Sequence, residues 1–279
     1  MVPARTRDNG FRMSHPHFLY GTAWKEEQTE RLTRLAIESG FRGIDTANQR
    51  RHYFEAGAGA AIAGAIRDGL VRREDLFVQT KFTYMRGQDH RLPYDANADP
   101  APQVRQSFES SLQHLQLDSI DSYVLHGPSV GRGLGDVDRA VWRAMEQLPV
   151  RYLGVSNVAL DQLEMLCAFA RKKPAFVQNR CFARTRWDAA IRAFCRHNGI
   201  VYQGFSLLTA NAAELQSPRF RAIAARLRRT PAQIVFRFAI QVGMLPLTGT
   251  TDPQHMREDL DLGFELSADD VETIENMAV

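Results

Sequence analysis

Three ionisable side chains interrupt short apolar segments of this sequence, and each lies near the end of its segment. Asp45 lies in RGIDTA, Lys81 in LFVQTKF and His126 in DSYVLHG. A charged group in an apolar segment costs free energy unless it is paired, and Asp45 and Lys81 could pair directly. Carboxylate, ammonium and imidazole groups are also the groups that enzymes use to move protons. A structural ion pair and a core histidine are the alternative interpretations.

The 35 Lys and Arg residues are nearly all arginine, and the only other lysines are Lys25, Lys172 and Lys173. A lysine inside an apolar segment therefore calls for a specific role. A tyrosine, Tyr53, follows Asp45 within a short polar stretch. It adds a fourth titratable group to the set.

Short apolar segments alternate with longer stretches of helical periodicity, as in repeated β–α units around a parallel sheet. The expected strands are His17–Trp24, Arg42–Ala47, Leu76–Phe82, Asp121–Gly127, Arg151–Asn157, Ala175–Cys181, Ile200–Ser206 and Met244–Thr250. The expected helices are Glu27–Ser39, Glu55–Asp68, Pro102–Leu117, Asp136–Leu148, Leu160–Lys172, Trp187–His197, Thr230–Gln241, Pro253–Leu262 and Ser267–Met277. Eight strands close a (β/α)8 TIM barrel of the α/β class.

No repeat or low-complexity linker divides the chain, so we expect one barrel domain over residues 16–279 and a disordered N-terminal segment over residues 1–15. A doubly wound sheet is the competing architecture, and it should carry a glycine fingerprint after its first strand. The only candidate, GAGAAI beginning at Gly57, lacks the third glycine and lies in a helical stretch. Close helix packing is the better interpretation of these glycines.

Barrel enzymes carry their working groups at the C-terminal ends of the strands. Polar or aromatic residues occur there on successive expected strands: Asp45, Lys81, His126, Ser156, Asn157, Gln178, Phe205 and Ser206. We expect these side chains to converge on one pocket. Their occurrence on consecutive strand ends favours a catalytic interpretation over an isolated structural ion pair.

Several short segments resemble the successive signatures of the aldo-keto reductases, in the order in which that family has them. They are Gly21-Thr22, GFRGIDTA (Gly40–Ala47), TKF (Thr80–Phe82), YVLHGP (Tyr123–Pro128), LGVSNV (Leu153–Val158) and the glutamine of FVQNR. The resemblance extends from about Tyr20 to the last helix. It implies an NAD(P)H-dependent enzyme that reduces an aldehyde or ketone to an alcohol by hydride transfer.

The resemblance also implies residue roles. Asp45, Tyr53, Lys81 and His126 would form the catalytic tetrad, with Tyr53 as general acid. Ser156, Asn157 and Gln178 would hold the nicotinamide carboxamide, Phe205 would stack on the nicotinamide ring, and Ser206 and Leu208 would line the pyrophosphate. Gly21 and Thr22 join this cofactor-binding set. Because a free tyrosine titrates near 10, we expect Lys81 to stabilise the phenolate and lower the pKa of Tyr53.

The loop before Tyr53 departs from the family pattern. The family's tyrosine follows the aspartate by about five positions, where this chain has Arg50, so NQRRHYFE (Asn48–Glu55) is a lengthened loop. We expect it to deliver Tyr53 because Tyr53-Phe54-Glu55 leads into a helix as the family's tyrosine does. Tyr84 or Tyr20 could serve instead. A non-catalytic relative that binds a nicotinamide coenzyme as a sensor or partner-binding module is the alternative function.

The coenzyme region after the eighth strand also departs from the pattern. The family commonly places a lysine or arginine and a later arginine against the 2′-phosphate of NADP(H), and this chain has Gly249, Thr250 and His255 near those positions. Glu258 and Asp259 would face the adenine. The resemblance favours NADP(H), but the missing cations leave NAD(H) possible unless Arg257, Arg184 or Arg186 substitutes.

The long C-terminal segment that narrows the substrate pocket in many relatives is not expected here, because the sequence stops at Val279. Substrate contacts then fall to Trp24 and to loops such as Tyr84–Ala101 and Ser129–Asp136. Arg50 beside the site would favour an anionic substrate, although a solvated arginine is the commoner explanation. We expect the partner to be a small-molecule carbonyl compound.

Composition argues against several other classes of protein. The net charge is +3, but acidic and basic residues are interspersed, which does not suit a nucleic-acid surface. No signal sequence or membrane-spanning run occurs, and Cys167, Cys181 and Cys195 form no C-x-x-C pair. We therefore expect a cytoplasmic monomer or weak dimer. A metal-dependent barrel hydrolase using His15 and His17 is disfavoured because these residues lie at or before the start of the first strand, at the bottom of the barrel, so we expect no metal.

Overall fold

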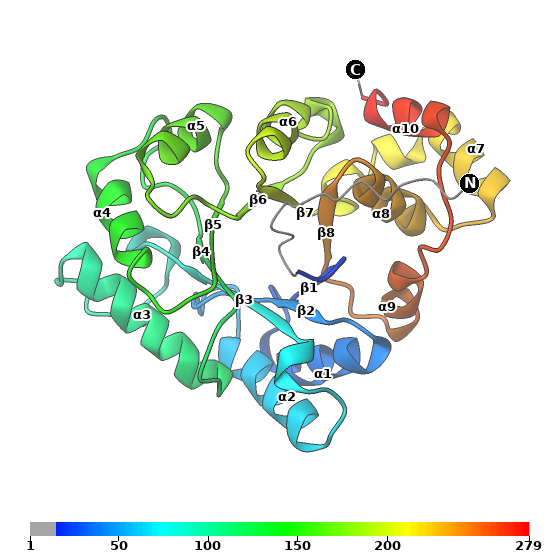
Figure 1. The fold of residues 1–279 in the computed structure, drawn as a ribbon. Coiled ribbons are helices and arrows are strands. Elements are labelled where there is room, and N and C mark those ends of the chain that lie inside the picture. Colours follow the sequence, from blue (N-terminus) through cyan, green and yellow to red (C-terminus); the bar gives the residue numbers. More distant parts are fainter. Residues whose placement is uncertain (1–14, 279) are drawn as a thin grey trace, which may run out of the picture.

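The computed structural model describes residues 15–278, and they form a closed parallel barrel (Figure 1). Its strands are β1 (Leu19–Gly21), β2 (Gly43–Asp45), β3 (Phe77–Phe82), β4 (Ser122–Leu125), β5 (Tyr152–Ser156), β6 (Phe176–Arg180), β7 (Val201–Phe205) and β8 (Met244–Thr248). Each strand pairs with the next, and β1 pairs with β8 to close the ring. The expected (β/α)8 barrel is confirmed. The N-terminal segment of residues 1–15 was expected to be disordered. Residues 1–14 of it lie outside the described residues, so this expectation stays a prediction.

Helices surround the strands (Figure 1). They are α1 (Thr29–Ser39), α2 (Glu55–Arg67), α3 (Pro100–Leu115), α4 (Asp136–Met145), α5 (Leu160–Phe169), α6 (Ala189–His197), α7 (Pro218–Leu227), α8 (Pro231–Gln241), α9 (Pro253–Leu260) and α10 (Ala268–Glu275). Nine of them correspond to the expected helices. The segment of α7 was not expected to be helical: it is arginine-rich and precedes α8 in the single connection between β7 and β8. Ser217 caps its first turn, and Phe220 and Ile223 are buried.

Gly59 of α2 allows close packing against α3. A Cβ added to Gly59 would lie 2.0 Å from the carbonyl oxygen of His114 and 2.6 Å from the Cα of Leu115. No side chain fits between these two backbones. The helical interpretation of the GAGAAI segment is therefore confirmed, and the doubly wound alternative is excluded by the closed strand order.

The main hydrophobic core lies between the barrel wall and the helices, where residues such as Tyr20, Phe82 and Trp142 are fully buried. A second apolar cluster consists of Leu19, Phe77, Tyr152, Phe176 and Leu245, which begin or nearly begin their strands. The rings of Phe77 and Tyr152 each contact the Phe176 ring at 5.5 Å between centroids. This cluster fills the N-terminal end of the barrel.

Polar side chains occur further along the same strands. The register aligns Asp45 with Gln79, and Gln178 with Gln203. The interior thus changes from apolar at the strand starts to polar toward the strand ends, where the predicted site residues lie. Among the described residues, no helix has both the length and the apolar character needed to cross a membrane.

Candidate active site

Lys81 and Asp45 form a fully buried ion pair at the ends of β3 and β2. Lys81 Nζ donates to Asp45 Oδ1 at 2.8 Å, to Oδ2 at 2.7 Å and to the carbonyl oxygen of Thr46 at 2.8 Å. All three ammonium protons therefore have acceptors. Burial lowers the pKa of Lys81, and the Asp45 carboxylate opposes that change. Since the paired geometry satisfies both charges, Lys81 is held rigidly as a cation.

A cluster of buried amides supports Asp45 from within the barrel. Gln79 Nε2 donates to Asp45 Oδ1 at 2.7 Å and to Gln203 Oε1 at 2.8 Å. Gln178 Nε2 donates to the same two acceptors at 3.0 Å. Gln203 and Ser122 in turn donate to Gln79 Oε1. Gln79, Gln203 and Ser122 are not among the predicted site residues, although each is a polar side chain in an apolar strand and so carries a usable signal.

Tyr53 lies against both Lys81 and His126. Lys81 Nζ is 5.3 Å from the centroid of the Tyr53 ring, and the Tyr53 and His126 rings meet edge to face at 5.9 Å. Burial and the charge of Asp45 raise the pKa of Tyr53. The expected lowering of this pKa by Lys81 is therefore wrong: Asp45, in direct contact with Nζ, balances the lysine charge. Tyr53 keeps its proton throughout the neutral range.

The lengthened loop that carries Tyr53 is anchored to two neighbouring elements. Asn48 Nδ2 donates to the Ser107 carbonyl oxygen of α3 at 3.1 Å, and Gln49 Nε2 donates to the Gly87 carbonyl oxygen at 2.6 Å. Within the loop, the amide N–H of Tyr53 donates to the Gln49 carbonyl oxygen at 3.0 Å. The extra residues thus form a compact turn that returns the chain to α2.

The two alternative tyrosines have other hydrogen-bond partners. Tyr20 OH donates to the carbonyl oxygen of Thr250 at 3.0 Å. Tyr84 OH donates to Asp138 Oδ1 at 2.8 Å, and burial together with Asp138 raises its pKa. The Tyr53 ring, by contrast, contacts both Lys81 and His126.

His126 is half-buried directly after β4, and its Nδ1 lies 2.6 Å from Thr83 Oγ1. Burial, followed by the charge of Lys81, lowers the pKa of His126 to about 3. The imidazole is therefore neutral at pH 7. A neutral imidazole carries one ring proton and can act as a hydrogen-bond donor to an oxygen.

Three residues predicted to hold the carboxamide meet beside His126. Ser156 Oγ donates to the Gln178 carbonyl oxygen at 2.7 Å, and Asn157 Nδ2 donates to the His126 carbonyl oxygen at 2.8 Å. Asn157 adopts a left-handed backbone, with φ of 51°. Gln178 Oε1 has no hydrogen-bond partner within residues 15–278. Their binding roles stay predictions.

The remaining predicted coenzyme residues lie at the ends of β1 and β7, on the loops that follow β1, β7 and β8, and on α9. Thr22 Oγ1 donates to the Asp45 carbonyl oxygen at 3.2 Å, and Gly21 pairs with Asp45 in the sheet. Phe205 ends β7, and Ser206 and Leu208 follow it; all three are half-buried, and Ser206 has a φ of 55°. Gly249 and His255 are exposed, whereas Thr250 is half-buried.

Asp259 differs from its neighbour Glu258 in its surroundings. Asp259 is only 2% exposed and accepts from Thr248 Oγ1 at 2.9 Å, and burial raises its pKa to about 6. Glu258 is half-buried and accepts from Gln254 Nε2 at 2.7 Å. The predicted contact of both with the adenine stays a prediction, and Asp259 also has a packing role beside β8.

Lys25 is a further candidate for the site, beyond the predicted residues. Its side chain is buried, and Nζ donates to the Gly249 carbonyl oxygen at 2.8 Å. Burial lowers its pKa to about 8, and no described carboxylate lies within salt-bridge distance. A buried lysine without an acidic partner beside Gly249 suits an anionic ligand group. The rarity of lysine in this chain was the available signal.

The two predicted substrate residues have different surroundings. Trp24 is 72% exposed, has a φ of 62° and stacks on His52 at 4.0 Å between ring centroids. Arg50 pairs with Glu26 at 3.0 Å and covers the Phe54 ring at 4.6 Å. The charge of Arg50 is thus already compensated. Its predicted substrate contact stays a prediction.

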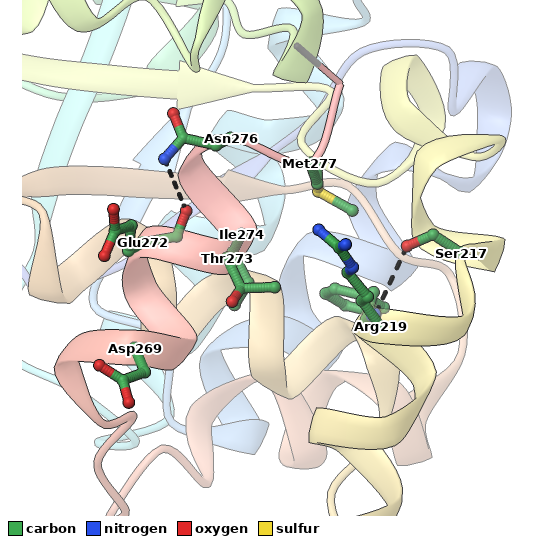
Figure 2. A pocket seen from close by; sticks show the side chains of 9 residues that line it. Ser217, Arg219, Asp269, Glu272, Thr273, Ile274, Asn276 and Met277 are labelled. Carbon is green, nitrogen blue, oxygen red and sulfur yellow. Dashed lines mark hydrogen bonds between the residues drawn. The ribbon is translucent and has the colours of Figure 1, made fainter.

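Two surface hollows lie away from these residues. Figure 2 shows the first, between Ser217 and Arg219 of the α7 region and Asp269, Glu272 and Thr273 of α10. The second hollow is lined by Arg186, Gln241 and residues of α10. Gln241 lies just before β8, whereas the predicted phosphate region lies after β8. That location does not support Arg186 as a phosphate contact. Within residues 15–278, no group of three or more His, Cys, Asp or Glu side chains is arranged to hold a metal ion.

Comparisons with known proteins identify the family. The family model described as "Aldo/keto reductase family" matches residues 17–278. The chain is 31% identical to the uncharacterized oxidoreductase YtbE of Bacillus subtilis (strain 168), over 97% of this chain and 91% of YtbE. It is 29% identical to prostaglandin-E(2) 9-reductase of Oryctolagus cuniculus, over 95% of this chain and 90% of that protein.

The fold also matches a solved structure of an aldose reductase from Schistosoma japonicum, with a TM-score of 0.80 and 23% identity. The match covers 94% of this chain and 88% of the aldose reductase chain. At this identity the likeness concerns the fold alone. From the family match, the chain belongs to the aldo/keto reductase family and is an oxidoreductase of carbonyl compounds.

Proposed function

We propose that this protein reduces an aldehyde or ketone to an alcohol with NADP(H), using Tyr53 as general acid and Lys81, Asp45 and His126 as its supporting groups. The observation that carries the proposal is the contact of the Tyr53 ring with both the Lys81 ammonium and the His126 ring. This contact brings a proton donor, a cation and a neutral imidazole together.

The residue chemistry follows from the charge that develops in the reaction. Hydride addition at a carbonyl carbon leaves negative charge on the oxygen, which needs a hydrogen-bond donor that finally gives up its proton. Tyr53 supplies that proton, and its raised pKa keeps the proton in place before the reaction. Lys81 stabilises the phenolate that remains, and His126 orients the oxygen. Asp45 keeps Lys81 charged and fixed.

A nicotinamide coenzyme fits the polar groups after β5, β6 and β8. When bound, it supplies the hydride. Gln178 uses its amide protons on Asp45 and Gln203, so its Oε1 is the atom available to accept from a carboxamide N–H. Lys25, beside Gly249, is suited to the anionic part of the coenzyme. Gln178 Oε1 and the buried Lys25 ammonium are therefore consistent with the coenzyme that the family resemblance implies.

NADP(H) is our preferred coenzyme, with weak discrimination against NAD(H). Gly249, Thr250 and His255 stand where relatives carry cations for the 2′-phosphate, and charge-assisted contacts are the usual source of phosphate selectivity. Exposed Arg257 is on the same helix as His255 and is the remaining cation nearest in sequence. Comparing KM and kcat for NADPH and NADH measures the preference. A lower KM for NADH would contradict it.

The substrate is proposed to be a small carbonyl compound that reaches the site past Trp24. Because Arg50 is paired with Glu26 and Glu27, selection for an anionic substrate has little support. A cytoplasmic setting and a monomeric or weakly dimeric state also remain proposals. The free cysteines Cys167, Cys181 and Cys195 support the former.

Spectrophotometric oxidation of NADPH and NADH against a panel of aldehydes and ketones tests the function directly. We expect turnover with at least part of the panel. Tight coenzyme binding without turnover on any member would contradict the proposal and would favour a sensor or partner-binding role instead.

A further inference from the structure

Thr83 lies immediately after β3, between the catalytic candidate Lys81 and the loop that begins at Tyr84. Its side chain is buried, and Oγ1 lies 2.6 Å from His126 Nδ1. No other side-chain or backbone group within residues 15–278 forms a hydrogen bond with this hydroxyl. The contact therefore decides which imidazole nitrogen of His126 carries the proton.

The direction of this hydrogen bond follows from the count of donors and acceptors. If Nδ1–H donated to Thr83 Oγ1, the threonine proton would be buried without an acceptor, which costs about 1–3 kcal/mol. If the threonine hydroxyl donates, Nδ1 accepts and the neutral imidazole carries its proton on Nε2. The second arrangement satisfies the buried donor.

We infer that Thr83 is a positioning residue that holds His126 as the tautomer protonated at Nε2, the form that donates to the substrate oxygen. This inference rests on the proposed carbonyl reduction. The opposite tautomer would direct the Nε2 lone pair at a carbonyl oxygen and repel it. The low pKa of His126 agrees with a neutral ring.

Packing holds Thr83 in the orientation that the hydrogen bond needs. A Cβ added to Gly87 would lie 2.8 Å from Thr83 Cγ2, so the Met85–Gly87 turn closes directly on the threonine methyl group. Tyr94 OH donates to the Thr83 carbonyl oxygen at 2.8 Å, and Gln88 Nε2 donates to it at 3.3 Å. The methyl group and the backbone are both fixed, which aims Oγ1 at His126.

His126 is fixed equally well at its backbone. Its amide N–H donates to the Phe82 carbonyl oxygen at 2.9 Å, and its carbonyl oxygen accepts from Asn157 Nδ2 at 2.8 Å. With Nδ1 bonded to Thr83, Nε2 is the ring nitrogen left for a substrate. Thr83 therefore links the end of β3 to the hydrogen-bonding state of the residue after β4.

Nitrogen-15 NMR of histidine-labelled protein tests the tautomer without any activity measurement. His126→Asn identifies the His126 signals. We expect the wild type to show Nε2 protonated and Nδ1 unprotonated at pH 7, and Thr83→Val to lose this preference because valine keeps the shape but has no hydroxyl. Thr83→Ser should retain it. A wild-type His126 protonated at Nδ1, or an unchanged tautomer in Thr83→Val, would overturn the inference.

Kinetics provide the second readout. We expect Thr83→Val to lower kcat about tenfold, because loss of one preorganised donor costs up to about 10²–10³-fold and the tautomer change is partial. The coenzyme KM should not change, and Thr83→Ser should stay within about threefold of the wild type. An equal loss of kcat in Thr83→Ser and Thr83→Val would show that Thr83 acts through packing and not through its hydroxyl, and would overturn the inference. A wild type with the expected tautomer but no turnover would contradict the proposed function and leave the positioning of His126 intact.

Discussion

The central side chains of the site are held in place by different contacts. Lys81 and Asp45 satisfy each other, and Gln79 and Gln178 complete the carboxylate. A buried ion pair is weak evidence for stability, since desolvation offsets the attraction between the charges. In the proposed mechanism, its role is to provide a fixed cation beside Tyr53. Tyr53 itself depends on a turn that Asn48 and Gln49 anchor.

Replacing Tyr53 with phenylalanine removes only the hydroxyl. We expect kcat/KM for carbonyl reduction to fall by about 10²–10⁴-fold, the usual contribution of a general acid. Coenzyme affinity should stay within a few-fold because the ring remains. Tyr84→Phe is the matched control, since its hydroxyl bonds to Asp138 away from Lys81, and it should keep most activity. Activity of Tyr53→Phe within a few-fold of wild type would remove Tyr53 from the catalytic role.

Lys25 predicts a pH dependence of coenzyme binding. Its pKa of about 8 means that it is a cation below that pH and loses its charge above it. Binding of an anionic coenzyme stabilises the cation, so affinity should fall as the pH rises above 8, by at most about tenfold per pH unit. Coenzyme titrations followed by fluorescence between pH 6.5 and about 9.5 measure the slope. Lys25→Met should bind more weakly at neutral pH and lose this slope, and an identical slope in the variant would exclude Lys25 as its source.

At the scale of elements, α2 illustrates how glycine positions differ within one helix. Gly59 faces the backbone of α3 at a distance that excludes a side chain, whereas a Cβ on Gly64 would meet only the far ends of Arg67 and Arg34 at 3.5 and 3.7 Å. The helix carries Glu55 at its start, directly after the loop that presents Tyr53. Displacement of α2 would therefore also disturb Tyr53.

Gly59→Ala should lower the free energy of unfolding by about 1–3 kcal/mol, because α2 and α3 must separate to admit the methyl group. Gly64→Ala is the control in the same helix. It should raise the free energy of unfolding by about 0.5–1 kcal/mol, since alanine restricts the unfolded chain and favours the helix. Urea unfolding of both variants measures the difference. Equal effects of the two substitutions would contradict the close packing of α2 on α3.

At the scale of the whole molecule, the barrel separates an apolar end from a polar end. Phe77, Tyr152 and Phe176 fill the N-terminal end, and the Asp45–Gln79–Gln203 cluster occupies the interior beyond it. Closure between β1 and β8 brings Tyr20 to Thr250 and Lys25 to Gly249. Residues from opposite ends of the chain thereby form one side of the proposed coenzyme site.

Asp259 makes the stability of the closed barrel depend on pH. Its pKa rises from 3.8 to about 6 on folding, so the neutral carboxyl stabilises the fold at low pH and this contribution is lost as the pH rises through 6. At roughly 1.4 kcal/mol per pKa unit, the loss reaches about 3 kcal/mol. The free energy of unfolding of Asp259→Asn, relative to that of the wild type, should therefore increase between about pH 4 and 6. Above about pH 6 the difference between the two proteins should stay constant. Chemical unfolding across this range, without coenzyme, measures the difference, and a difference independent of pH would contradict the expectation.

Several features were predictable from the sequence because they depend on local patterns. Alternating apolar segments and amphipathic stretches predicted the eight strands and nine of the ten α-helices found within residues 15–278. The polar residues at strand ends indicated where Asp45, Lys81 and His126 meet. The α7 segment was missed because its connection already contained a stronger helical pattern in α8. Glycine spacing in α2 predicted a close helix contact but not its partner, α3.

Contacts between residues distant in sequence were decided only by the tertiary structure. Sequence order alone does not reveal that Gln79 and Gln203 bond to each other across the barrel, that Lys25 lies beneath Gly249, or that Thr83 meets the Nδ1 of His126. The sequence also predicted a lowered pKa for Tyr53, whereas the pKa is raised. The reason is that burial of Tyr53 and the compensation of the Lys81 charge by Asp45 exist only once the barrel has closed. The residue types needed for the chemistry are therefore readable in the sequence, whereas their charges and hydrogen-bonding states arise from how the closed barrel excludes water and pairs them.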